Sequence, residues 1–244
     1  MYLETADIET ASEDYATRFS GPAGAFFLER QAAITLELLA SLPGSRVLDV
    51  GGGHAQLAEP LVKHGYRVTV TGSDPCCRSR LDRLLPAGSF SYETCDSLAL
   101  PYADRSFDVV MAFRLLPHAE RWRQLLAEMC RVAARCVVVD YPDRRSSNVL
   151  YELLFAAKKR MEGNTRTFTL FSRAEVGGEL RRLGFSPATF RPEFFLPMVL
   201  HRKLNHRGLS TLLEGGSRLC GLTALFGSPI IVRADRPADG GRPA

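Results

Sequence analysis

The stretch Val47-Leu48-Asp49-Val50-Gly51-Gly52-Gly53-His54-Ala55-Gln56 decides the fold of this chain. Apart from Asp49, its first four residues are apolar, which predicts a buried strand. Three glycines follow, and glycines let a backbone turn tightly and approach a ligand closely. The start of a helix offers free N–H groups to such a ligand. We therefore expect a strand, a ligand-binding glycine loop and a helix in succession.

Short apolar runs alternate with helical patterns on both sides of this stretch. Runs typical of strands lie at 46–50, 66–70, 107–112 and 136–140, with a weaker one at 90–94. Apolar residues at helical spacing fill the segments 54–64, 76–85 and 120–133. Continuous apolar runs suit strands that are buried on both faces. The alternation predicts an α/β fold with a doubly wound, Rossmann-like parallel sheet.

The flanks of this core are predicted to be largely helical. Residues 8–18 and 24–41 form two helical patterns separated by Ser20-Gly21-Pro22, and we expect residues 1–43 to be a helical N-terminal lid. Ser172 and Glu175 have the spacing of a capping box, which predicts a helix over 173–183.

Two further strands, near 185–195 and at 229–233, complete a predicted seven-stranded sheet. A helical insertion near 203–222 precedes the last strand and forms a cap. The main domain is expected over 44–235, with cap segments at about 143–171 and 190–228. The tail 236–244, rich in Pro and Gly, is predicted to be disordered.

Composition narrows the class of protein. With 244 residues, 45% of them hydrophobic, the chain can bury a core without disulfide or metal staples. The acidic N-terminus and the lack of an apolar run of ~18 residues predict a cytoplasmic protein without stable membrane insertion. The six cysteines form no CxxC pair, so we expect no metal site. The basic residues are scattered, which argues against a nucleic-acid partner.

Three acids follow three successive strands. Asp49 precedes the glycine loop, Asp74 ends the second strand and Asp96 follows the third. An acid about 20 residues past a glycine loop is placed to bind both ribose hydroxyls of an adenosine ligand. Asp96 is placed to hold an adenine amino group. Asp49 would repel a pyrophosphate but suits an amine-bearing ligand.

These motifs resemble those of the class I S-adenosylmethionine-dependent methyltransferases, specifically methyltransferase type 11, which includes ubiquinone/menaquinone-biosynthesis and many small-molecule methyltransferases. Residues 47–53 are similar to the family's glycine motif, Asp74 to its ribose acid and Asp96 to its adenine acid. Residues 100–110 resemble its fourth-strand signature. Ala133-Ala134-Arg135-Cys136 departs from the family's common Pro-Gly-Gly turn.

The resemblance implies S-adenosylmethionine as cofactor and S-adenosylhomocysteine as product. It implies methyl transfer to a small, largely apolar acceptor, by O- or C-methylation of a secondary metabolite, a quinone or a lipid-like molecule. The partner that we expect is this small-molecule acceptor, and the sequence leaves a homodimer open.

Candidate site residues follow from the strand ends, the resemblance and the predicted cap. The candidate cofactor-binding residues are Tyr15, Arg18, Asp49, Gly51, Gly53, Asp74, Pro75, Asp96, Ser97 and Arg114. The candidate substrate-binding residues are Tyr141, Phe195, Met198 and His201. If the acceptor is a hydroxyl or a carbon acid, His118 and His201 are the candidate catalytic bases. Each has a structural alternative: Asp49 as a helix cap, Tyr15 and Arg18 on a solvated helix face, and the aromatic residues in the core.

Two other functions stay open on the sequence alone. One is an NAD-dependent oxidoreductase that binds its cofactor through the glycine loop. Gln56 at the third position of the dinucleotide fingerprint and Asp96 argue against it. The other is a non-catalytic S-adenosylmethionine-binding protein that regulates or scaffolds a partner.

Overall fold

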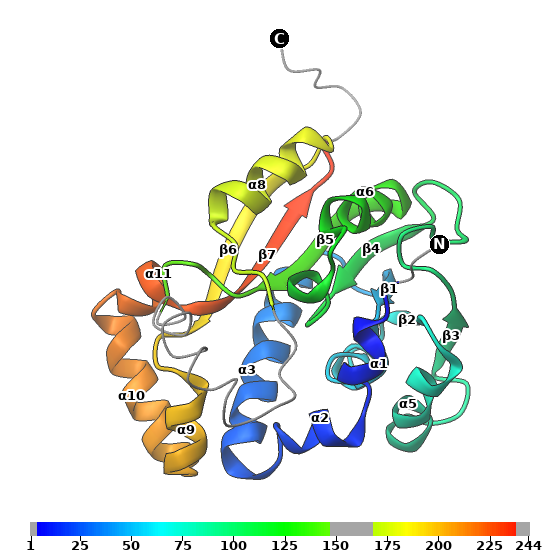
Figure 1. Cartoon of the computed structure of the whole chain (residues 1–244). Coiled ribbons are helices and arrows are strands. Elements are labelled where there is room, and N and C mark those ends of the chain that lie inside the picture. The colour runs from blue at the N-terminus through cyan, green and yellow to red at the C-terminus, as the bar shows by residue number, and fades with distance from the viewer. Residues whose placement is uncertain (1–3, 147–167, 238–244) are drawn as a thin grey trace.

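The computed structural model describes residues 4–146 and 168–237, which form a central sheet between layers of helices (Figure 1). Most of the predicted cap segment 143–171 and of the predicted tail 236–244 lies outside the described residues. The seven strands have the order β3-β2-β1-β4-β5-β7-β6. Their bounds are β1 Arg46–Val50, β2 Arg67–Gly72, β3 Phe90–Thr94, β4 Phe107–Ala112, β5 Ala133–Tyr141, β6 Ser186–Phe194 and β7 Ser228–Asp235.

The direction of the strands differs in one respect from the prediction. β1 to β5 run parallel, as predicted, whereas β7 lies antiparallel between β5 and β6. The sheet is therefore mixed. The reason is the helical insertion between β6 and β7. It leaves and re-enters the sheet at the same end of the strands, so β7 runs back alongside β6 in the opposite direction. The Rossmann-like fold with seven strands is confirmed.

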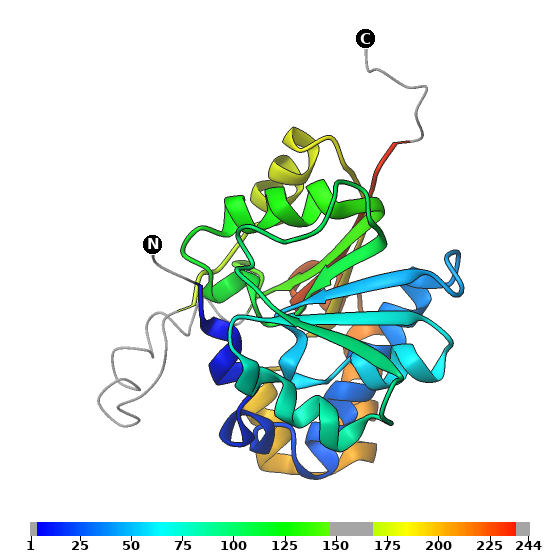
Figure 2. The same ribbon diagram turned by 90° about the vertical axis from the view of Figure 1, so that its right-hand side faces the viewer.

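The helices cover both faces of the sheet (Figures 1 and 2). Their bounds are α1 Ala6–Thr10, α2 Glu13–Thr17, α3 Gly21–Leu39, α4 Ala58–Lys63, α5 Ser79–Leu84, α6 Trp122–Val132, α8 Arg173–Arg182, α9 Met198–Leu204, α10 Arg207–Leu219 and α11 Leu222–Phe226. Short 3₁₀ turns are η1 Gly52–His54, η2 Pro75–Arg78 and η3 Leu116–His118. The capping box of Ser172 and Glu175 at the start of α8 is confirmed.

Alternate residues of the inner strands face two separate apolar clusters. Leu48 and its neighbours pack towards α6 and α8, and Val47 and its neighbours pack towards α3, α4 and α5. Because both faces are covered, these strands are apolar throughout. Polar groups of the inner strands therefore gather at the carboxyl ends of β1 to β5, where the loops begin.

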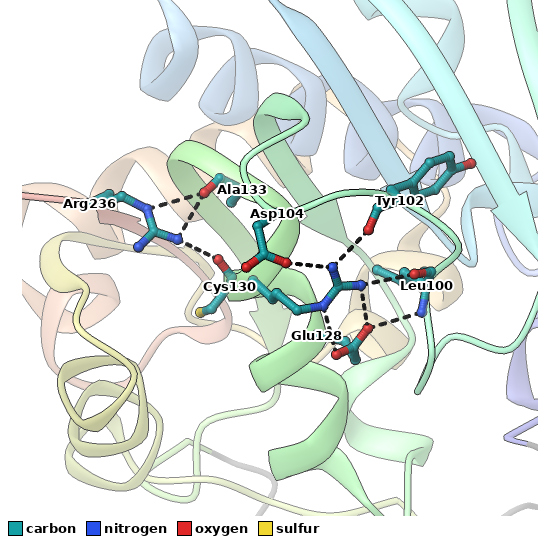
Figure 3. A network of polar contacts seen from close by, with 8 residues as sticks. Leu100, Tyr102, Asp104, Glu128, Cys130, Ala133 and Arg236 are labelled. Atoms are coloured by element: carbon teal, nitrogen blue, oxygen red, sulfur yellow. Dashed lines mark hydrogen bonds and ion pairs between the residues drawn. The ribbon is translucent and has the colours of Figure 1, made fainter.

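Hydrogen bonds and ion pairs attach the segment before β4 to α6 (Figure 3). Arg131 donates to the carbonyl oxygens of Leu100 (2.9 Å) and Tyr102 (2.7 Å) and forms an ion pair with Glu128 (2.8 Å). The segment 100–110 singled out in the sequence is thus anchored by a helix residue. Arg236 donates to carbonyl oxygens at the end of α6, where β5 begins without an intervening turn.

The cap helices α9 and α10 lie beside α3 (Figure 1). An aromatic cluster joins them, in which the rings of Phe27 and Phe194 meet edge to face at 5.2 Å and the His201 ring lies 5.7 Å from Phe27. Aromatic pairs of this geometry stabilise a contact beyond simple burial. The helical insertion predicted before the last strand is present.

Candidate functional site

The glycine loop is shaped by its conformation and by close packing. Gly51 has φ +70°, in the left-handed region that favours glycine, and its N–H donates to the carbonyl of Thr71 at 2.9 Å. A Cβ on Gly53 would lie 2.6 Å from the carbonyl oxygen of Cys77, closer than the two atoms can approach. Glycine is therefore required at both positions that the sequence assigned to the cofactor.

Asp49 lies directly beneath this loop. Its side chain is fully buried, and neither carboxyl oxygen has a hydrogen-bond partner among the described residues. Burial raises the pKa of Asp49 to about 7, and the nearby Asp140 carboxylate adds to the shift. A buried carboxyl group without a donor is costly, so this group is poised to accept hydrogen bonds from a ligand.

Asp74 follows the neighbouring strand, β2, by two residues. Its Oδ1 accepts the N–H of Cys76 at 2.8 Å and so caps η2, and hydrogen bonding to Cys76 lowers the pKa of Asp74. The carboxylate therefore stays ionised, and the residue is half-buried just beyond the strand end. Pro75 occupies the first position of η2, where a missing N–H costs nothing.

Asp96 and Ser97 follow β3. Asp96 Oδ1 accepts the N–H of Leu98 at 2.9 Å. Its Oδ2 and the hydroxyl of Ser97 are buried, and neither has a hydrogen-bond partner in the described part of the chain. These two atoms, like the carboxyl oxygens of Asp49, lie at the carboxyl ends of the parallel strands. Buried polar atoms without a partner in the protein indicate a polar ligand that supplies one.

The space between these groups is nearly filled by α1. A cavity of about 10 Å³ remains, and its lining includes Gly51, Ser97 and Asp7. Asp7 is 3% exposed and its carboxylate accepts both the N–H of Ser73 at 2.6 Å and its hydroxyl at 2.5 Å. Because a nucleoside-sized ligand needs about 300 Å³ or more, α1 has to move before such a ligand binds.

A second polar group lies at the ends of β4 and β5. Arg114 has φ +58°, and its N–H donates to Asp140 Oδ1 at 2.6 Å. Its guanidinium pairs with Asp140 at 3.5 Å and donates to Gln31 at 2.9 Å. Arg114 is thus held by side chains of α3 and β5. Elsewhere in the N-terminal segment, the guanidinium of Arg18 lies 5.0 Å above the ring of Tyr15, which is itself buried.

Glu193, near the end of β6, extends this group. The residue is fully buried, and neither carboxyl oxygen has a hydrogen-bond partner among the described residues. Burial raises the pKa of Glu193 to about 8, partly offset by the positive charge of Arg114. Sequence reasoning missed Asp140 and Glu193 as site residues. The rule applied to Asp49, an acid that ends an apolar strand, would have found Asp140.

The two candidate bases lie in different surroundings. His118 ends η3, just after β4, and its ring lies 6.5 Å from the ring of Phe168. His201 is fully buried inside the cap, with Nδ1 2.9 Å from the Ser210 hydroxyl and Nε2 3.0 Å from Glu214. Both ring nitrogens are thus occupied within the cap core, which favours a structural role for His201 over that of a base or substrate contact.

The other predicted substrate contacts also differ in placement. Tyr141 is fully buried, and its ring packs 6.0 Å from that of Phe171 in the apolar cluster under α6 and α8. Tyr141 thus lies in the core, as the structural alternative expects, and its hydroxyl has no hydrogen-bond partner among the described residues. Phe195 and Met198 are half-buried where β6 passes into α9, and Met198 packs against the Phe27 cluster.

Within residues 4–146 and 168–237, no group of three or more His, Cys, Asp or Glu side chains is arranged to hold a metal ion. None of the helices there combines the length and the apolar character that crossing a membrane requires.

Comparison with known proteins places the central segment in a family. Residues 48–135 match a family model described as a methyltransferase domain. This segment is a methyltransferase type 11 domain. It contains the glycine loop, Asp74, Asp96 and Arg114, so most of the polar edge described above belongs to the methyltransferase domain.

Individual relatives are similar over the same part of the chain. An uncharacterized methyltransferase of Mycobacterium avium is 33% identical over 92 residues, which are 38% of this chain and 36% of that protein. The ubiquinone biosynthesis O-methyltransferase of Hahella chejuensis is 38% identical over 98 residues, 38% of this chain and 41% of that protein. The chain therefore spans less than half the length of these curated relatives.

Solved structures resemble the chain over a greater length. The magnesium protoporphyrin IX methyltransferase of Synechocystis, solved with bound SAH, has a TM-score of 0.63 at 17% identity. The match covers 88% of this chain and 86% of that one. At 17% identity, this likeness shows that the two chains share a fold.

Proposed function

We propose that this protein is an S-adenosylmethionine-dependent methyltransferase acting on a small, largely apolar acceptor. The observation that carries the proposal is the set of buried polar atoms without partners around the glycine loop. They belong to Asp49, Asp96 and Ser97, and the ionised Asp74 stands beside them. Buried polar atoms that lack a partner in the protein indicate a ligand that supplies one.

The chemistry of these groups fits the proposed cofactor. Asp74 would accept hydrogen bonds from the ribose hydroxyls. Asp96 and Ser97 would hold the adenine ring, and Asp49 would accept from the amino group of the methionine part. At Gly51 and Gly53 the protein's own atoms occupy the space that a Cβ would take, so these glycines shape the loop beside the proposed ligand. A dinucleotide fits less well, because the buried Asp49 would repel a pyrophosphate at the loop.

When bound, S-adenosylmethionine supplies a methyl group that is already activated by its sulfonium. The protein's own contribution is then to hold the acceptor in line and to exclude water. Helices α1 and α2 lie where they would cover the ligand, with Tyr15 buried under α2. His118, at the end of η3, is the residue that would take a proton from a hydroxyl or carbon acid.

The acceptor is proposed from the cap and from the relatives. Half-buried Phe195 and Met198 lie at the junction of β6 and the cap and would contact an apolar acceptor. A relative that matches the central segment carries the name ubiquinone biosynthesis O-methyltransferase. Together these observations favour an aromatic or lipid-like acceptor with a hydroxyl or an acidic carbon.

Transfer of label tests the activity. The protein is incubated with tritium-labelled S-adenosylmethionine and a solvent extract of small molecules, and the products are separated. We expect radioactivity in a small, extractable compound, and we expect it to be lost in Asp74→Ala. Tight cofactor binding without any labelled product across extracts would instead favour the non-catalytic binding protein.

A further inference from the structure

Glu193 is a buried carboxyl group without a hydrogen-bond partner in the described part of the chain. It is the last residue but one of β6 and is 0% exposed, and both of its carboxyl oxygens lack a partner there. A carboxyl group buried in this way costs free energy, which an apolar residue of similar size would avoid. Its presence indicates a use other than holding the fold.

The register of the sheet shows which way Glu193 faces. Asp140 of β5 stands opposite Ile231 of β7, which in turn stands opposite Arg191 of β6. Residues that stand opposite each other in antiparallel strands share a face of the sheet, as do residues two apart in one strand. Arg191 pairs with Glu37 of α3. Asp140 and Glu193 therefore both project to the α3 side, with β7 between them.

The strand order sets the spacing of the acids along this edge of the sheet. Asp49 belongs to β1, Asp140 to β5 and Glu193 to β6, and one strand separates each acid from the next. Since neighbouring strands lie about 4.8 Å apart, each step from one acid to the next covers about 10 Å. Asp49 is the acid proposed for the amino group of the cofactor. Glu193 thus lies at the far end of the edge from the cofactor.

The charges around Glu193 leave no place for a cationic ligand. The charged groups that act on Glu193 are those of Arg114, Asp140 and Arg30. Two positive charges and one negative charge leave one positive charge, which an ionised Glu193 would only balance. A cationic amine at this point would therefore stand beside two arginines without a countercharge.

Unpartnered donors accompany the unpartnered oxygens of Glu193. The Nε atoms of Arg30 and Arg114 are buried, and neither has a hydrogen-bond partner among the described residues. A hydroxyl group both donates and accepts a hydrogen bond, so it can serve the carboxyl group and a guanidinium N–H together. An uncharged hydroxyl group is therefore the ligand group that matches this set.

Aromatic side chains follow Glu193 along the chain. The ring of Phe194 meets that of Phe27 edge to face at 5.2 Å, and Phe195 is half-buried where β6 passes into α9. Glu214 of α10 accepts the N–H of Phe195 at 3.0 Å and so fixes this junction. The surroundings of the carboxyl group thus suit a ligand whose body is aromatic.

We propose that Glu193 binds a hydroxyl group of an aromatic acceptor, at the end of the acceptor that is remote from the methylated atom. Glu193 is then a specificity residue that takes no part in the chemical step, and His118 keeps its proposed role. The inference rests on the proposed function, because only methyl transfer makes this ligand an acceptor. Since Glu193 is buried, the acceptor displaces part of the layer above it, as the cofactor displaces α1.

Two probes that differ by one hydroxyl group test this recognition. Dihydroxybiphenyl carries a hydroxyl at each end, and para-phenylphenol carries only one. Each is titrated calorimetrically into the full chain, with and without S-adenosylhomocysteine. We expect the wild type to bind the diol about tenfold more tightly, the scale of one buried hydrogen bond, and Glu193→Leu to bind both probes equally. A third probe, with a charged aminomethyl group in place of one hydroxyl, should bind more weakly than the diol.

Thermal melting of the ligand-free chain separates this role from a structural one. Because burial raises the pKa of Glu193 to about 8, Glu193→Leu removes little charge at pH 7. The variant should melt about 2 to 4 °C higher, since it replaces a buried carboxyl group that has no partner. Glu214→Leu is the matched control, because Glu214 is equally buried but accepts hydrogen bonds from Phe195 and Leu196. That variant should melt lower than the wild type.

The outcomes keep this inference apart from the proposed function. Equal binding of the two biphenyl probes by the wild type, or binding of neither, overturns the inference. A preference for the diol that persists in Glu193→Leu, or a lower melting temperature of that variant, overturns it as well. Failure of S-adenosylhomocysteine to bind contradicts the proposed function instead, while the probes titrated alone still report on the recognition of a hydroxyl by Glu193.

Discussion

Asp7 and Ser73 are joined by two hydrogen bonds across the mouth of the glycine loop, at 2.6 Å to the backbone N–H and 2.5 Å to the hydroxyl. One residue comes from α1 and the other follows β2. The pair closes the small cavity between Gly51 and Ser97. The proposed cofactor site is therefore closed by a short helix that two hydrogen bonds and local packing hold in place.

Asp7→Ala should open this site. The substitution removes both hydrogen bonds, each to a charged acceptor, and so weakens the closed state by about 1 to 3 kcal/mol. Since binding requires the open state, the apparent affinity for S-adenosylhomocysteine should rise by about tenfold. Asp14→Ala, at an exposed residue of α2, serves as control in the same titration. A loss of affinity in Asp7→Ala would make α1 part of the binding site rather than its closure.

The contribution of Asp49 to the stability of the ligand-free protein should fall as the pH rises from about 5 to 7. The pKa of Asp49 is about 7 in the folded protein, above its ordinary value near 4. The folded state then binds more protons than the unfolded state across this window, so stability declines by up to about 1.4 kcal/mol per pH unit for this group. His54 opposes this decline below about pH 6.5, because burial lowers its pKa to about 4 and the unfolded state therefore binds the extra proton.

Asp49→Asn isolates that contribution, because the amide cannot ionise. In urea unfolding at several pH values, the stability of the wild type relative to Asp49→Asn should fall as the pH rises from about 5 to 7, with Asp14→Asn as an exposed control. An unchanged slope would show that Asp49 is already ionised in the folded protein at pH 5.

Gly53→Ala should destabilise the fold by about 1 to 3 kcal/mol, the usual cost of overpacking. Its Cβ would lie 2.6 Å from a backbone carbonyl that cannot easily move. Gly178→Ala in α8 is the contrasting variant, because its Cβ meets no atom within 4 Å. That variant should gain up to about 1 kcal/mol from helix propensity. Equal stability of the two variants in urea unfolding would contradict the packing seen at the loop.

His201→Ala should cost about 3 kcal/mol of unfolding free energy, because it removes the partner of the buried Ser210 hydroxyl and one of the hydrogen bonds of the buried Glu214 carboxylate, which keeps those from the N–H groups of Phe195 and Leu196. A structural role predicts that the pH profile of methyl transfer stays the same well below the melting temperature. His64→Ala, at an exposed histidine, controls for the loss of an imidazole. A variant that melts normally but loses a titrating step in its rate profile would restore His201 as a base.

Local patterns predicted the parts of the fold that local chemistry controls. The strands of the parallel core are continuous apolar runs because both faces are covered, and the glycine loop is recognisable because its conformation excludes other residues. The three acids at strand ends were recognisable for the same reason, since an acid is rare at the end of a buried strand. The capping box at Ser172 is a local contact and was equally visible.

The rest depends on contacts between distant segments. Nothing in the five residues of α1 indicates that Asp7 binds Ser73, 66 positions away. The leucines of α10 (Leu209, Leu212, Leu213 and Leu219) recur at helical spacing, which predicts a helix, but such a stripe would ordinarily face inward. Only the His201 and Glu214 contacts show why it faces outward. The reversed direction of β7 is likewise set by the cap that precedes it and not by its own residues.

Calorimetric titration of S-adenosylhomocysteine into the wild type and into Asp74→Ala tests the central claim most directly. The account predicts one binding site per chain in the wild type and a loss of about 1 to 3 kcal/mol in the variant, the scale for leaving ribose hydroxyls unpaired. Asp74→Asn can still cap η2 and separates loss of the cap from loss of the charge. NADH, titrated in parallel, should give no heat of binding. Saturable binding of NADH, or equal affinity of the wild type and Asp74→Ala for S-adenosylhomocysteine, would contradict the account.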